Sequence, residues 1–251
     1  MSENKISIDP ITRLEGHGKI EIHLDETGKP ENAVLQVPEL RGFEEFSRGR
    51  KGEDMPRITE RICGVCPEAH HFASTKALDA AYSTSPPETA LLLRELLYNS
   101  YIFADHLLHL FYLGGPDFLA EDTKSKRNIV GVIETLGESL GKRLIKTRRL
   151  AHEAIEIIGG HQVHPITGIP GGLSKGITEE KQGELAEIGE SVLDFAQEVL
   201  NLFHEKVIEG DKFGALVDNP DYSLDTYYMG LIDGDNRVSF YDGELRVVDP
   251  L

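Results

Sequence analysis

The chain has 251 residues, 39% of them hydrophobic, and its 43 acidic residues against 26 basic ones give a formal charge of −17. This length and apolar content suffice for one large globular domain or two small ones. Phosphate contacts need clustered Lys and Arg, so the acidic excess argues against nucleic-acid binding. The charge predicts solubility and a docking surface for a more basic partner.

The amino terminus and the apolar segments predict a cytoplasmic protein. Residues 1–5 lack the apolar core of a signal peptide. The most apolar stretch, 89–113, is interrupted by charged and polar side chains, which a membrane-spanning helix rarely tolerates. Two cysteines at CxxC spacing do not make the disulfide framework of a secreted domain, so we expect a reducing compartment.

Apolar residues alternate near the amino terminus, as they do in strands. Every second residue is apolar around Ile6 and Ile8, and again from Ile20 to Leu24. Turn residues at 25–28 precede a returning strand over 33–37. A small antiparallel sheet is therefore expected at the start of the fold.

Helical periodicity follows, and the fold class expected is α+β, mainly α. The pattern predicts a bundle of long antiparallel helices. A C-terminal β-hairpin is predicted from strands over 238–241 and 244–248, which flank Asp242-Gly243. We expect one incomplete domain over 1–251, with sheet and loops over 1–60, a helical core over 61–210, and a loop and hairpin over 211–251. The predicted helices cover 67–82, 88–113, 129–158 and 178–208.

Residues 61–71, Arg-Ile-Cys-Gly-Val-Cys-Pro-Glu-Ala-His-His, contain both cysteines of the chain, Cys63 and Cys66. Their spacing lets both sulfurs reach one metal ion or close one disulfide. Pro67 predicts a helix start with Cys66 near its N-cap, where the helix dipole favours a thiolate. His70, one turn further on the same face, can hydrogen-bond a metal-bound sulfur.

Taken alone, this motif leaves several kinds of site open. A zinc site with Cys63, Cys66 and a histidine is one, and an unliganded buried pair is another. Thiol-disulfide exchange is a third, although the polar run over 49–60 is not the strand that usually precedes such a motif.

Other segments extend the pattern of 61–70, namely 12–17 (Thr-Arg-Leu-Glu-Gly-His), 41–44 (Arg-Gly-Phe-Glu), 159–165 (Gly-Gly-His-Gln-Val-His-Pro) and 170–172 (Pro-Gly-Gly). Together these segments resemble the amino-terminal half of the large subunit of nickel-iron hydrogenases. The resemblance spans most of the chain and is closest to the cytoplasmic methanogen-type group that is viologen-reducing or linked to heterodisulfide reductase. That family holds nickel with four cysteines, and its second CxxC motif has no counterpart here, so we expect a fragment or half-subunit.

The resemblance implies a role for five residues. Cys63 would be a terminal nickel ligand, and Cys66 would bridge nickel to an iron bearing CO and cyanide, with His70 hydrogen-bonding the bridging sulfur. Glu15 would relay the proton, and Glu44 would bind a Mg or Fe ion near the active site. Both metal sites need the missing half.

Plainer interpretations of the same residues stay open. Glu15 is otherwise a solvated glutamate before a turn glycine, and Glu44 a partner of Arg41 or Arg48. His70 is otherwise a capping or core residue. The loop histidines 161 and 164 either face an electron-transfer subunit or are solvated.

The function implied is that of an oxidoreductase, a hydrogenase that cleaves H2 reversibly and heterolytically. Electrons would pass to an iron-sulfur small subunit, with flavoprotein or heterodisulfide reductase subunits as further partners. Two cysteines are too few for one cluster with four thiolate ligands, so a partner is required. The isolated fragment is expected to be inactive. The alternative is a non-catalytic structural or interaction subunit of the same fold, like the related subunit of respiratory complex I.

Overall fold

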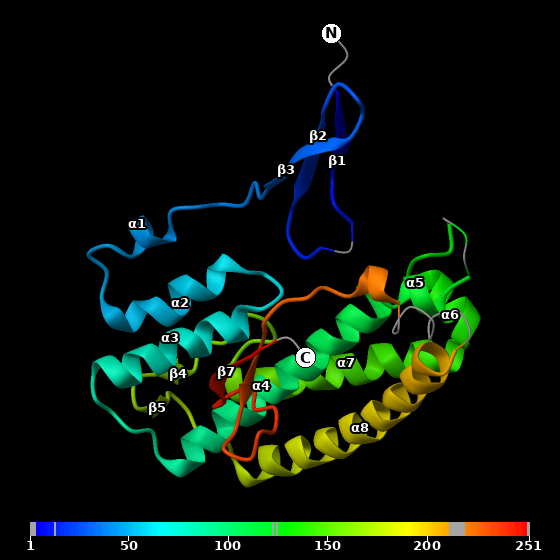
Figure 1. Ribbon diagram of the computed structural model, residues 1–251. Helices are drawn as coiled ribbons and strands as arrows, with labels where there is room; N and C mark the ends of the chain where they lie inside the picture. The colour runs from blue at the N-terminus through cyan, green and yellow to red at the C-terminus, as the bar shows by residue number, and fades with distance from the viewer. Residues whose placement is uncertain (1–3, 13, 122, 124, 211–218, 250–251) are drawn as a thin grey trace. The chain divides into compact units, whose positions relative to one another are not determined.

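The structure is a computed structural model that describes residues 4–12, 14–121, 123, 125–210 and 219–249 (Figure 1). Its contacts divide the chain into two compact units, Met1–Arg48 and Gly49–Leu251. Among the described residues, no helix combines the length and the apolar character that crossing a membrane requires.

The first unit contains the predicted antiparallel sheet. Strands β1 (Lys5–Ile8), β2 (Lys19–Leu24) and β3 (Pro30–Gln36) lie in the order β1-β2-β3. Ile22 lies opposite Ile6 on one side and Ala33 on the other, as the alternating pattern requires. The Asp25 carboxylate accepts the backbone N–H groups of Thr27 and Lys29 at 2.8 and 2.9 Å, which fixes the turn into β3. A short helix, α1 (Phe43–Ser47), follows.

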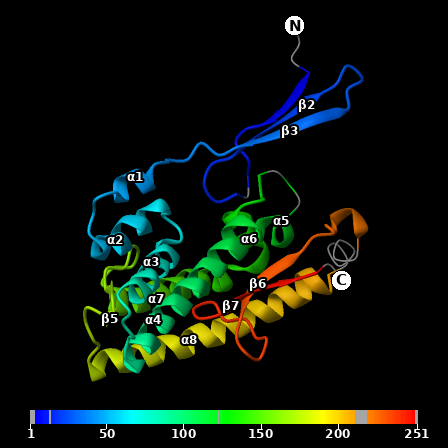
Figure 2. The same ribbon diagram turned by 60° about the vertical axis from the view of Figure 1, so that its left-hand side comes forward.

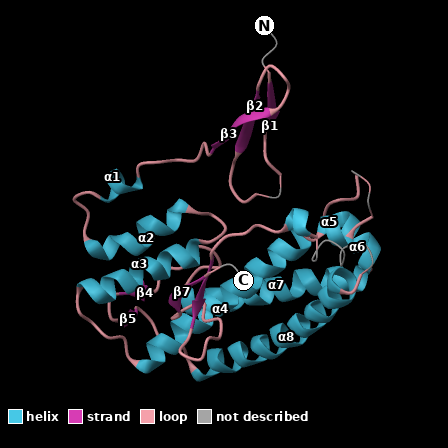
Figure 3. Ribbon diagram, in the orientation of Figure 1, coloured by secondary structure: helices cyan, strands magenta, loops and turns pink. Residues whose placement is uncertain are grey.

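The second unit is mainly helical, as Figure 3 shows. Helices α4 and α7 pack together, α8 packs on α7, and α3 contacts α4 (Figure 2). Pro67 starts α3, as the sequence predicts, while Pro116 starts α5 and Thr178 caps α8. The elements are η1 (Gly52–Asp54), α2 (Met55–Thr59), η2 (Glu60–Ile62), α3 (Pro67–Ala81), α4 (Glu88–Leu108), η3 (His109–Leu113), α5 (Pro116–Leu119), α6 (Ile129–Leu136), α7 (Glu138–Gly159), β4 (Gly168–Ile169), β5 (Gly172–Leu173), α8 (Glu179–Phe203), η4 (His204–Ile208), η5 (Pro220–Tyr222), β6 (Tyr228–Ile232) and β7 (Glu244–Val248).

Two clusters of buried apolar side chains form the core of this unit. The first surrounds Leu97 of α4 and Ile155 of α7, and the second surrounds Phe195 of α8. Fully burying one such side chain stabilises the fold by about 1.5–3 kcal/mol. Cys66 packs against the first cluster, so the start of α3 is anchored on the core.

The single helix predicted over 129–158 is wrong, because the chain breaks at Gly137. This residue has φ 98° and ψ 149° and separates α6 from α7. Only glycine adopts this backbone conformation without strain. The two helices then pack closely, since a Cβ added at Gly141 would lie 2.9 Å from Ile133 Cγ1.

The C-terminal hairpin forms with a different first strand. β6 pairs antiparallel with β7, and Leu231 lies opposite Leu245. The predicted strand over 238–241 is wrong, because residues 240–242 form a turn. Tyr241 is buried in the first core cluster, and its carbonyl accepts a hydrogen bond from Lys76 Nζ at 2.6 Å. These contacts hold Tyr241 in the turn, and of the predicted strand Val238 makes only an isolated bridge with Ile232.

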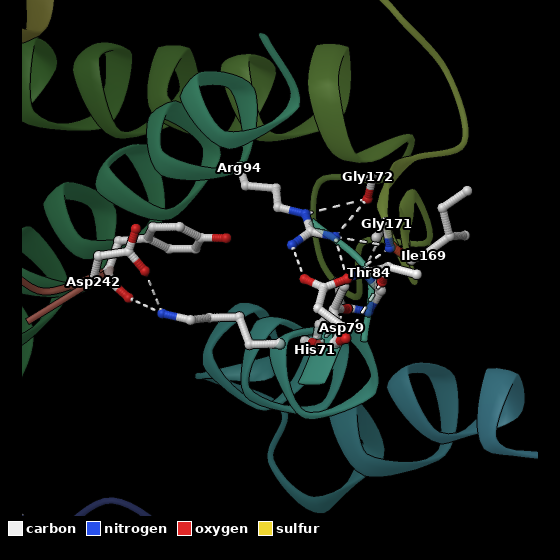
Figure 4. Close-up of polar contacts among 12 residues, drawn as sticks. His71, Asp79, Thr84, Arg94, Ile169, Gly171, Gly172 and Asp242 are labelled. Atoms are coloured by element: carbon white, nitrogen blue, oxygen red, sulfur yellow. Dashed lines mark hydrogen bonds and ion pairs between the residues drawn. The ribbon is translucent and has the colours of Figure 1, made fainter. Parts of the chain in front are cut away.

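Arg94 ties α3, α4 and the β4–β5 loop together, as Figure 4 shows. Its guanidinium is fully buried and donates to Asp79 Oδ2 at 2.6 Å. It also donates to the carbonyls of Ile169 and Gly172, each at 2.8 Å. Gly171 N–H donates to the other Asp79 oxygen at 2.7 Å. Because the charges are paired and hydrogen-bonded, the core tolerates them, and the carboxyl-terminal end of α3 is held in place.

Candidate metal centre

The cysteine turn joins η2 to α3. Cys63 is extended, with φ −133° and ψ 136°, and Cys66 is the N-cap of α3 with Pro67 at the first helical position, as predicted. The backbone N–H of Cys66 donates to Cys63 Sγ at 3.2 Å. This bond curls the turn so that the first sulfur lies over the helix start, where the helix dipole favours negative charge.

The two sulfurs and a ring nitrogen of His70 converge at the start of α3. These three ligand atoms all lie within 4.8 Å of one another, and each residue is half-buried. No disulfide joins the cysteines. Ligand atoms around a tetrahedral metal are about 3.5–4 Å apart, given metal–ligand bonds of about 2.0–2.3 Å. A small adjustment of side chains therefore suffices to hold a metal ion.

The chemistry of this donor set fits a soft metal. Thiolates bind nickel, zinc or iron-sulfur clusters, whereas magnesium and calcium prefer oxygen ligands. Three protein donors also leave coordination positions open, which is the arrangement of catalytic rather than structural sites. The residues of the turn therefore fit a nickel site that is completed by further ligands.

A cavity of about 110 Å³ lies beside the turn, lined by Gly64, Val65 and residues of α3, α4 and α7. Its charged residues were not predicted from the sequence to have a role. These charged residues come from three helices. The sequence signal that could have indicated them is a pair of polar residues one helical turn apart on an otherwise apolar helix face, such as Arg148 and His152. The acidic and basic residues of the lining are Glu68, Asp105, Arg148 and His152.

Burial shifts the pKa of the Glu68 carboxyl group and of the His152 imidazole in this lining. Glu68 is 2% exposed, and burial raises its pKa to about 7, with smaller contributions from the carboxylates of Glu60 and Asp105. Burial lowers the pKa of His152, and the Arg148 charge acts in the same direction. At neutral pH the cavity therefore holds a neutral imidazole beside a carboxyl group that is close to its midpoint.

The Gly-rich loop after α7 approaches the cysteine turn through one histidine. Gly160 ends α7 with φ 87°, and His164 adopts φ 61°. The pKa of His164 is lowered, by burial first and by the Arg61 charge second, while the nearby Glu60 acts in the opposite direction. His161 is exposed. The loop thus places His164, rather than His161, beside the residues that precede Cys63.

The other two predicted site residues belong to the first unit. Glu15 is exposed in the loop that the Ile11–Gly18 backbone hydrogen bond closes. Glu44 is exposed in the first turn of α1, where its neighbour Glu45 pairs with Arg48 at 3.3 Å. Arg13 of the same motif lies outside the described residues. The approach of Glu15 and Glu44 to the cysteines stays a prediction.

Comparisons with known proteins found matches that cover both the cysteine turn and the rest of the chain. A family model for nickel-dependent hydrogenases matches residues 41–130, which include the cysteine turn, and a HoxL-like model matches residues 5–40. Over 98% of its length the chain is 42% identical to a subunit of the vhu F420-non-reducing hydrogenase of Methanocaldococcus jannaschii. The chain belongs to the nickel-dependent hydrogenase family.

Within the nickel-dependent hydrogenase family, the similarity to methanogen-type sequences is confirmed. The chain is also 41% identical to an iron-sulfur subunit of the F420-non-reducing hydrogenase of Archaeoglobus profundus, over 95% of this chain and 50% of that protein. The crystal structure of an NAD+-reducing [NiFe]-hydrogenase in its H2-reduced state matches with a TM-score of 0.86 and 32% identity, over 98% of this chain and 54% of that one.

This chain aligns with only part of the length of its relatives in the nickel-dependent hydrogenase family. The chain covers 58% of the M. jannaschii protein and 50% of the A. profundus protein. It therefore spans about half the length of the curated relatives it matches.

Proposed function

We propose that this chain supplies one half of a nickel-iron centre that cleaves H2 reversibly and heterolytically. The observation that carries the proposal is the pair of reduced cysteines at the start of α3, with His70 within 4.8 Å of both sulfurs. Family membership makes nickel the metal to expect among those that fit this donor set. The centre, with CO and cyanide on its iron, would supply the soft metal pair that polarises H2.

The residues of the turn prepare the two thiolates. The Cys66 N–H donates to Cys63 Sγ, the sulfur of the proposed terminal ligand, and so helps to fix its position. Cys66, the proposed bridging ligand, lies at the positive end of the 15-residue helix α3. A ring N–H of His70 would hydrogen-bond the bridging sulfur and lower its basicity.

Two glutamates complete the proposed site. Glu15 would take the proton from the thiolate region and pass it outward. Glu44 would hold a Mg or Fe ion through its carboxylate, a ligand suited to a hard cation. Both roles come from the matching motifs, and both require the first unit to approach the cysteine turn.

The remaining parts of the enzyme would come from other polypeptide segments. A site with four thiolates needs two more than Cys63 and Cys66, the two cysteines of the 251 residues. Electrons would leave to an iron-sulfur small subunit, with flavoprotein or heterodisulfide reductase subunits beyond it, in the cytoplasm. The chain would thus act as a half-subunit.

The test is to rebuild the centre from two pieces. The chain is co-expressed with the maturation proteins, with a small subunit, and with the part of the M. jannaschii vhu protein that it does not match. We expect H2-dependent viologen reduction by the assembled complex, and none by the isolated 251-residue chain. Cys63→Ser and Cys66→Ser should each abolish it, whereas the control His204→Asn, an exposed residue at the start of η4, should retain it.

A second candidate function is a structural or interaction subunit without metal. The observation that favours it is the number of cysteines, because two thiolates do not complete a nickel site. An assembled complex that contains no nickel and reduces no viologen, while the subunits still associate, would establish this alternative and contradict the first.

A further inference from the structure

Glu60 is a buried carboxylate at the start of η2, immediately before the cysteine turn. Its side chain is 0% exposed, and within the described residues neither carboxylate oxygen has a hydrogen-bond partner. Two longer contacts remain, from His71 Nδ1 at 3.4 Å and from Arg61 Nε at 3.6 Å. A buried charge is costly unless it is well paired, so its presence here calls for a functional explanation.

His71 approaches Glu60 from α3, and its ring is fully buried. Its Nε2 accepts the backbone N–H of Gly168 at 3.0 Å. Because a backbone N–H can only donate, the ring proton must be on Nδ1. That proton faces the Pro56 carbonyl at 3.3 Å and the Glu60 carboxylate at 3.4 Å. One ring therefore connects α2, η2 and β4 to α3.

The strand β4 prevents the ring from turning away. A Cβ added at Gly168 would lie 2.5 Å from His71 Nε2 and 2.8 Å from Thr75 Oγ1, so the backbone rests directly on these side chains. Close packing of this kind fixes a side chain in one rotamer. The Nδ1–H group is thereby aimed at Glu60 and Pro56.

The two cysteines are connected to this cluster from opposite sides. Cys63 directly follows η2, which begins with Glu60, and Cys66 is the N-cap of the helix that carries His71. We propose that His71, acting through Glu60, is a positioning residue that fixes Cys63 Sγ relative to Cys66 Sγ before the metal arrives. A prearranged pair avoids the cost of ordering the turn on binding. The inference rests on the proposed function for the role of the two sulfurs as ligands.

Two substitutions separate the two contacts of the ring. In His71→Asn the amide N–H takes the place of Nδ1–H, so the group that faces the Pro56 carbonyl and the Glu60 carboxylate is kept and the acceptor for Gly168 is lost. In His71→Gln the amide oxygen takes the place of Nε2, so the reverse holds. Val132→Ala, 1% exposed in the second core cluster, serves as a control for lost stability elsewhere.

The measurement is the affinity of the reduced full-length chain for cobalt(II), which is monitored through the thiolate-to-cobalt absorbance. The thermal unfolding of the metal-free chain is measured in parallel. We expect His71→Gln to bind cobalt about tenfold more weakly, the size of effect typical of a lost outer-shell partner, and His71→Asn to stay within about threefold. Val132→Ala should unfold at lower temperature with unchanged affinity. Unchanged affinity in His71→Gln, or an equal loss in all three variants, would overturn the proposal.

Phenylarsine oxide distinguishes a failure of this inference from a failure of the proposed function. The arsenical bridges two closely placed thiols without any nickel chemistry. If the wild-type chain binds phenylarsine oxide but binds no cobalt, the proposed role of the two cysteines as metal ligands fails. The positioning role of His71 is then judged from the binding of the arsenical alone. Weaker binding in His71→Gln than in His71→Asn supports positioning. Equal binding in both, or no binding by the wild-type chain, overturns it.

Discussion

Glu68 shows at the residue scale what burial beside the cysteine turn does to a carboxyl group. Its pKa is about 7 in the folded chain and close to 4.5 in the unfolded chain, with burial as the main cause. Between these values the folded state binds more protons, so stability falls as the pH rises from 4.5 to 7 and levels off above. At about 1.4 kcal/mol per pH unit, this difference corresponds to roughly 3 kcal/mol.

Glu68→Gln removes this titration and should therefore stabilise the metal-free chain at high pH. In urea unfolding we expect the variant to gain about 1–3 kcal/mol over the wild type at pH 8 and little at pH 5. The control is Glu95→Gln, an exposed glutamate on α4, which should show no such pH-dependent gain. A gain for Glu68→Gln that is the same at both pH values would contradict the assignment.

The grouping of Cys63, Cys66 and His70 could be predicted from the sequence because the three residues lie within eight consecutive positions. A CxxC spacing, a proline and one helical turn fix their geometry locally. The lining of the adjacent cavity could not be predicted, because Asp105 and Arg148 come from different helices and meet Glu68 through packing.

At the scale of elements, Gly137 decides whether the chain forms one helix or two. Gly137→Ala must place a side chain at φ 98°, which costs about 1–3 kcal/mol. Gly183→Ala, inside α8 and with open space around an added Cβ, should instead stabilise by about 0.5–1 kcal/mol. Chemical denaturation of both variants measures the difference. Equal effects of the two substitutions would contradict the described break.

Elements were predictable where local signals agree with tertiary packing. The sheet of the first unit and the start of α3 follow from alternation and from Pro67. The break at Gly137 could not be predicted, because the apolar pattern continues across it and one glycine is tolerated in a helix. The first hairpin strand was misplaced because Lys76, 165 positions earlier in the chain, holds Tyr241 in the turn.

At the scale of the whole molecule, the chain spans about half of its relatives' length, and in the proposed function it would supply half of the metal site. The helical core holds Cys63, Cys66 and His70 in one turn, and α3 is fixed at its far end by the Asp79–Arg94 pair. Preorganisation of this kind is useful only if further ligands reach the open side of the metal. The roles of Glu15 and Glu44 depend in the same way on the arrangement of the complete enzyme and stay predictions.

The most direct test of a nickel site built on Cys63 and Cys66 is nickel K-edge X-ray absorption of the anaerobically assembled two-piece complex. We predict about one nickel per chain with mainly sulfur ligands, and Cys63→Ser should lower both the nickel content and the sulfur coordination number. Nickel bound at full stoichiometry, with the same sulfur coordination in Cys63→Ser and Cys66→Ser as in the wild type, would contradict a site built on these two cysteines.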